Sequence, residues 1–172
     1  MAMRTARRTG PDLLGVYLND HLAGATAGVE LSRRMTASAE PKSAAAGTLK
    51  KLSAEIAADR GSLIKIMTAL DIPRRNYKVF AAWAGEKAAR LKLNRRLLTR
   101  SPLSSLEEAE ILRLGVEGKA AGWRTLRVLA ERDTRLDTST LDELIARAAR
   151  QSAVLEDLRT DIAEQLLADN AV

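Results

Sequence analysis

Apolar side chains recur at alternating three- and four-residue steps through residues 49–70. This is the spacing of one buried face of an α-helix. The face consists of Leu49, Leu52, Ile56, Leu63, Ile66 and Leu70. One position breaks the pattern, because Asp59 stands where an apolar residue is needed. A carboxylate among apolar neighbours is costly unless it is paired, protonated or bound to a cation, so we expect other helices to supply its partner.

The same periodicity predicts five amphipathic helices joined by short loops. Their expected ranges are 12–37, 47–70, 74–99, 105–131 and 138–168. Three of the breaks contain proline, which disfavours helical backbone at the residue before it. These prolines are Pro41, Pro73 and Pro102. Helices connected in this way are typical of an antiparallel four- or five-helix bundle, so we expect one all-α domain over residues 9–172.

Three of these helices begin with recognisable signals. Asp12 follows Pro11 and places an acid in the first turn. Ser105 and Glu108 have the spacing of a capping box, in which each side chain accepts a hydrogen bond from the other residue's backbone N–H. Thr138 or Ser139 is expected to cap the last helix.

Small and aromatic residues refine this picture. The second half of helix 12–37 is slim, with small side chains at Ala23, Gly24, Ala25, Ala27 and Gly28. Glycine costs a helix about 1 kcal/mol relative to alanine, so we expect these residues to permit the close approach of a neighbouring helix. Only 3 % of residues are aromatic. We expect Trp83 and Trp123 to fill the core, with their indole N–H groups bonded nearby.

The net charge of +6 is unevenly distributed. Residues 73–100 carry nine Lys or Arg against one acid, whereas residues 137–172 carry eight acids against three Arg. The two regions can neutralise each other, within the chain or across a dimer. The alternative is a surface that binds nucleic acid or another polyanion, assisted by a disordered basic tail over residues 1–8. Its residues would be Arg74, Arg75, Lys92, Arg95 and Arg96.

Several kinds of chemistry have no residues to support them. The absence of cysteine excludes disulfides, Fe–S clusters and thiol catalysis. The chain has no P-loop, no dinucleotide-binding glycine motif and no His-Glu-x-x-His pattern, so no cofactor is predicted from motifs. No apolar run reaches the ~20 residues of a membrane helix, and the N-terminus lacks the apolar stretch of a signal peptide. We therefore expect a cytoplasmic protein without a membrane partner.

Polar residues are expected to meet halfway along the bundle. In an antiparallel hairpin, residues equally distant from the loop lie at the same height. His21 and Asp59 are centred on the first loop, and Glu117 and Gln151 on the last turn. We predict a buried polar layer in which Arg90 is the first choice as partner of Asp59. Its expected members are His21, Asp59, Glu86, Arg90, Glu117 and Gln151.

In its layout the chain resembles the ferritin-like superfamily. Acidic or polar residues stand about 34 positions apart across each hairpin, from Asp20 or His21 to Glu55 and from Glu117 to Gln151. The resemblance implies a di-metal site, of iron or manganese, built from Glu on two helices and Glu-x-x-His on the other two. Those motifs are not intact here. The sequence Glu55-Ile56-Ala57-Ala58 lacks the second ligand of its motif, and Gln151-Ser152-Ala153-Val154 lacks both.

Three functions are therefore compatible with the sequence. The first is a non-enzymatic ferritin-like bundle in which the metal site has become a buried polar network. The second is a degenerate carboxylate metal protein, with His21, Glu55, Asp59 and Glu117 as the ligands. The third is the nucleic-acid or polyanion binder described above. The first guess for the assembly is a homodimer.

Overall fold

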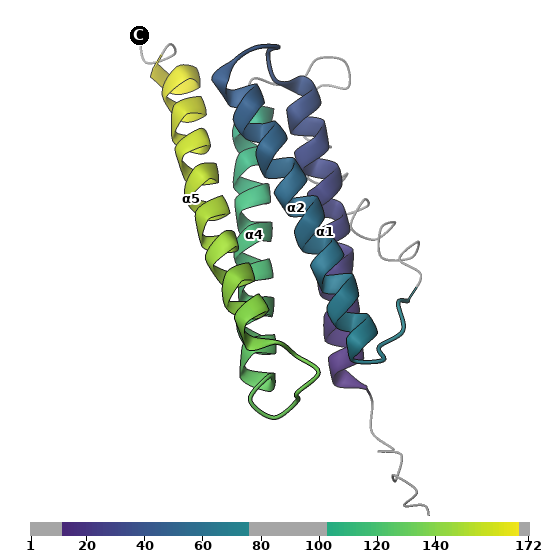
Figure 1. Cartoon of the computed structure of the whole chain (residues 1–172). Coiled ribbons are helices and arrows are strands. Elements are labelled where there is room, and N and C mark those ends of the chain that lie inside the picture. The colour runs from purple at the N-terminus through teal and green to yellow at the C-terminus, as the bar shows by residue number, and fades with distance from the viewer. Residues whose placement is uncertain (1–11, 76–102, 169–172) are drawn as a thin grey trace, which may run out of the picture.

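The structure is a computed structural model that describes residues 12–75 and 103–168 (Figure 1). These residues form four α-helices and no strand. The helices are α1 (Leu13–Ser38), α2 (Ala44–Ala69), α4 (Ser104–Leu129) and α5 (Thr138–Ala168). The prediction of an all-α bundle is confirmed to this extent. None of the helices in the described ranges is long and apolar enough to cross a membrane.

Helices α1 and α2 each begin at a polar cap. Asp12 is itself the N-cap of α1, where its Oδ1 accepts a hydrogen bond from the backbone N–H of Gly15 at 2.8 Å. Ser43 caps α2 and accepts from the N–H of Ala46 at 3.1 Å. Helix α2 therefore begins three residues before the predicted start, because a serine side chain satisfies an N–H group that apolar periodicity does not detect.

Two other predicted caps are wrong. The residue before α4 is Leu103, and no side chain caps this end, so the Ser105–Glu108 capping box does not form. Asp137 caps α5 instead of Thr138 or Ser139, because its Oδ1 accepts from the N–H of Thr140 at 2.6 Å. Helix α4 begins at Ser104 and α5 at Thr138, so the side chains predicted as caps lie within the first turn of each helix.

Neighbouring helices meet in pairs. Helix α1 packs against α2 and α4, and α5 packs against α4 and α2 (Figure 1). Between α1 and α2, Ser32 Oγ lies 3.0 Å from Ser53 Oγ. Nearer the end of α2, Arg60 donates to Thr26 Oγ1 at 2.9 Å. Late residues of α1 therefore meet early residues of α2.

The core is aliphatic, with Trp123 as its one aromatic residue within the described ranges. The predicted face of α2 is confirmed, with one addition. Leu49, Leu52, Ile56, Leu63 and Leu70 are buried, and Met67 is buried in addition to the half-buried Ile66. Asp59 is buried within the same face.

The chain after α2 is held to α1 by a buried asparagine that the sequence analysis missed. Asn19 Nδ2 donates to the carbonyls of Gly15 and Pro73, at 2.7 and 3.1 Å. Its Oδ1 accepts from the backbone N–H of Arg75 at 2.7 Å. Residues 72–75 are not helical, so the helix predicted from Arg74 does not begin there. The rest of this predicted helix lies outside the described ranges. It includes Trp83, Glu86, Arg90, Lys92, Arg95 and Arg96.

Candidate functional site

A charged network surrounds Asp59, whose side chain is 0 % exposed. Lys119 of α4 places its Nζ 2.5 Å from Asp59 Oδ2. Arg147 of α5 contacts the other oxygen, with Nε 2.7 Å and Nη2 2.5 Å from Asp59 Oδ1. Both carboxylate oxygens thus accept hydrogen bonds from cations on two other helices. The partner predicted from the sequence was Arg90, whereas the described structure shows Lys119 and Arg147 in this role.

Gln151 of α5 completes the network and is itself buried. Its Oε1 accepts from Lys119 Nζ at 2.5 Å. Its Nε2 donates to Asp59 Oδ2 at 3.1 Å and to Glu55 Oε2 at 3.2 Å. The amide uses its acceptor and both donors, which satisfies the requirement that buried polar groups be hydrogen-bonded.

The network is balanced in formal charge, with two acids and two cations. Burial lowers the pKa of Lys119, and the neighbouring Asp59 carboxylate opposes that shift. The ammonium donates to two acceptors at once, which is the arrangement expected of a charged lysine. Asp59 therefore has no unused oxygen directed toward an additional cation.

The predicted polar layer is assembled only in part among the described residues. Asp59 and Gln151 do meet, but Glu117 lies at the surface rather than in the buried layer. It is joined there by the hydroxyl of Ser152, which donates to Glu117 Oε1 at 2.6 Å. Glu117 was misplaced because it flanks the buried face of α4, from which a long side chain can reach water.

The metal ligands suggested by the sequence are also separated. Glu55 and Asp59 share the network, whereas His21 packs against Gly122 and Glu117 binds Ser152. Within the described ranges, no group of three or more His, Cys, Asp or Glu side chains is arranged to hold a metal ion. The nearest charged neighbours of Asp59 are the Lys119 ammonium and the Arg147 guanidinium, and these cations do not coordinate metals.

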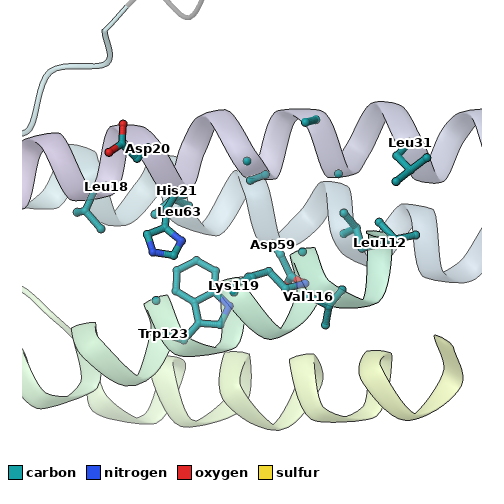
Figure 2. A pocket seen from close by; sticks show the side chains of 18 of the residues that line it. Leu18, Asp20, His21, Leu31, Asp59, Leu63, Leu112, Val116, Lys119 and Trp123 are labelled. Atoms are coloured by element: carbon teal, nitrogen blue, oxygen red, sulfur yellow. The ribbon is translucent and has the colours of Figure 1, made fainter. Parts of the chain in front are cut away.

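A cleft of about 570 Å³ lies between α1 and α4, with α2 forming its floor. Figure 2 shows that Trp123 and His21 stand toward one end, that Lys119 and Asp59 lie in the middle, and that Leu31 lies toward the other end. The lining is mainly apolar. Its charged members are Asp20, Asp59 and Lys119.

An aromatic cluster forms the His21 end of the cleft. The rings of Tyr17 and His21 meet edge to face, with centroids 4.5 Å apart. The Tyr17 hydroxyl donates to Thr125 Oγ1 at 3.2 Å and so links α1 to α4. A Cβ at Gly122 would lie 2.9 Å from His21 Cε1, so glycine leaves the room that the imidazole occupies. Burial lowers the pKa of His21, whereas nearby Asp20 raises it to a smaller extent.

The slim half of α1 lines this cleft, which corrects the prediction of close helix approach. A Cβ built at Gly24 meets no atom within 4 Å, and one built at Gly28 reaches only Ile56 Cγ2, at 4.0 Å. Gly115 and Gly118 of the opposite wall are equally open. Gly24, Gly115 and Gly118 therefore border a space, whereas Ala23 is buried in the core and Gly28 lies near Ile56 of α2.

Lys119 and Arg147 are the site residues that the sequence analysis missed. Lys119 lies three residues after Val116 and four before Trp123, and Arg147 lies four residues before Gln151. This spacing places each on the same helix face as buried residues, although lysine and arginine at such positions commonly extend their heads to water. Only the buried Asp59 signalled that two such cations must turn inward. The remaining described residues of the basic surface, Arg74 and Arg75, are exposed.

No protein-family model, curated protein or solved structure matches this chain.

Proposed function

We propose that this protein is a non-enzymatic helical bundle of antiparallel, ferritin-like layout, in which protein cations occupy the place that a di-metal centre has in that superfamily. The observation that carries the proposal is the complete neutralisation of Asp59 by Lys119 and Arg147.

The geometry of the network supports this proposal. Asp59 and Glu55 come from α2, Lys119 from α4, and Arg147 and Gln151 from α5. Helices α2 and α5 make less contact with each other than either makes within its own hairpin. The network therefore joins the two hairpins across their weaker interface. Buried ionic groups of this kind can specify which helices pair, even where they add little net stability.

The order of the contacts supports the antiparallel layout. Ser32 meets Ser53, and Thr26 meets Arg60. In the second hairpin, Arg127 binds Asp142 at 3.0 Å and Arg113 lies 3.1 Å from Glu156. In each hairpin the residues closest to the connecting loop meet one another, and those farther from the loop meet in turn.

Metal analysis tests the proposal. The full chain, purified without added metal, should contain less than a tenth of an equivalent of iron, manganese or zinc by mass spectrometry. Chelator should leave its Tm unchanged, because a bound metal would stabilise the folded state and its removal would lower the Tm. Stoichiometric metal, or a chelator-dependent fall in Tm, would overturn the proposal.

A lysine variant tests whether Lys119 neutralises Asp59. Lys119→Met removes the cation while retaining most of the aliphatic chain, and Lys65→Met makes the same change at an exposed position of α2. Lys119→Met should lower the stability by about 3 kcal/mol, because it deprives a buried carboxylate of one of its two cations. Lys65→Met should change it by less than about 0.5 kcal/mol. Equal effects of the two changes would mean that Lys119 is not needed to neutralise Asp59.

A further inference from the structure

The cleft between α1 and α4 contains a buried donor with no acceptor. Trp123 is 2 % exposed, and its Nε1 has no hydrogen-bond partner among the residues that the structure describes. This corrects the prediction that the indole N–H is bonded nearby. Figure 2 shows the ring between His21 and Lys119, with its nitrogen on the Lys119 side. A buried donor without an acceptor costs about 1–3 kcal/mol, so an acceptor that enters the cleft and displaces the side chains covering Nε1 would be favoured there.

The cleft is long and apolar beyond this donor. Its lining extends along α1 from Tyr17 to Leu31 and along α4 from Ile111 to Leu126. At about 1.5 Å per residue, both walls are roughly 20 Å long. Gly24, Gly115 and Gly118 leave open space between the walls. A cleft of about 570 Å³ is in the size range of small-molecule sites.

The charges around Trp123 favour an uncharged acceptor. The Lys119 ammonium is already bonded to Asp59 and Gln151. Asp20, the remaining acid of the lining, lies near His21. Burial lowers the pKa of His21, which favours the neutral imidazole. Among the described lining residues, no unpaired cation therefore remains to attract a carboxylate head group.

We infer that the cleft binds a linear aliphatic molecule with an uncharged carbonyl head, its oxygen accepting a hydrogen bond from Trp123 Nε1–H and its chain lying between the glycine-lined walls. This site goes beyond the proposed function. Its test gives no information about metal, so either proposal can fail while the other stands.

The indole resonance of Trp123 in ¹⁵N–¹H NMR spectra provides a direct test. The second indole is assigned with Trp83→Phe in the full chain. Addition of 2-undecanone should shift the Trp123 N–H resonance downfield in a saturable manner, because a hydrogen bond to an acceptor deshields the proton. Undecane should give no downfield shift, and undecanoate should bind at least tenfold more weakly than the ketone. No saturable shift with the ketone, the same shift with undecane, or tighter binding of undecanoate would each overturn the inference.

Two glycine variants locate the site. Gly118→Leu adds a side chain that enters the open cleft, whereas Gly47→Leu adds the same side chain at a glycine of α2 that does not line it. Gly118→Leu should weaken ketone binding at least tenfold, and Gly47→Leu should leave it unchanged. Equal binding by the two variants would place the ketone elsewhere.

A tryptophan variant identifies the donor. Trp123→Phe keeps an aromatic ring but removes the N–H group, and binding is then followed by the methyl resonances of Val116 and Leu63, which line the cleft. The ketone should bind about fivefold more weakly, as expected for one lost neutral hydrogen bond. Unchanged ketone affinity would show that Trp123 donates no hydrogen bond to it.

Discussion

Asp59 is the residue on which the polar centre depends, because both its oxygens are occupied by cations and its side chain is sealed from water. Asp59→Ala leaves Lys119 and Arg147 close together without their shared counter-charge. We expect a loss of about 3–5 kcal/mol in the free energy of unfolding, measured by urea denaturation.

The matched control is Asp142→Ala, which removes a carboxylate that also pairs with an arginine. Its side chain is 59 % exposed, so water already screens the ion pair with Arg127. This change should cost less than about 1 kcal/mol. If Asp59→Ala cost no more than the control, the carboxylate would not be buried as described.

His21 makes the folding stability of the protein depend on pH in the mildly acidic range. Its folded-state pKa is lowered from 6.5, chiefly by burial. The unfolded chain therefore binds a proton at higher pH than the folded chain does, and stability must fall as the pH drops below about 6.5. Because His21 is the chain's only histidine, His21→Gln should flatten the Tm profile between pH 7.5 and 5.5. If His21→Gln left the dependence of Tm on pH unaltered, titration of His21 would not be its cause.

At the scale of one helix, α4 offers a comparison between two of its glycines. Gly118→Ala places a methyl group in open space, and Gly122→Ala places one 2.9 Å from the His21 ring. Alanine is the better helix former, so Gly118→Ala should raise the stability by about 0.5–1 kcal/mol. Gly122→Ala should show no such gain, because the imidazole must move.

A double-mutant cycle tests whether the His21 imidazole is what prevents Gly122→Ala from raising the stability. In the background of His21→Ala, Gly122→Ala should recover the stabilisation seen at Gly118, as measured by denaturant midpoints. If Gly122→Ala stabilised the native background equally, the two residues would not be in contact.

For the molecule as a whole, we expect the charged network around Asp59 to determine which helices pack together. Replacing both partners of a buried ion pair by apolar residues is often neutral or stabilising, unlike removing one. Asp59 has two cation partners, so both must be replaced with it. We expect Asp59→Leu combined with Lys119→Met and Arg147→Met to be at least about 2 kcal/mol more stable than Asp59→Ala, and to give broader amide resonances if helix pairing becomes less specific. A triple variant as unstable as Asp59→Ala would mean that the network is needed for stability itself.

The four described helices and the buried face of α2 were accessible from the sequence, because helical periodicity and prolines are local signals. Leu49, Leu52, Ile56 and Leu63 follow from spacing alone, and the costly position of Asp59 follows from the same spacing. These properties depend on residues within one or two turns of each other, which is the distance over which a sequence pattern carries information.

The partners of Asp59 were decided only by the tertiary structure. Lys119 and Arg147 lie 60 and 88 residues away along the chain. Helical spacing places each on a buried face, but local spacing does not identify the carboxylate that they meet. The cleft has the same origin, since glycines permit either a close helix contact or an open space. Which of the two occurs depends on how far apart α1 and α4 are held, and packing of the whole bundle sets that distance.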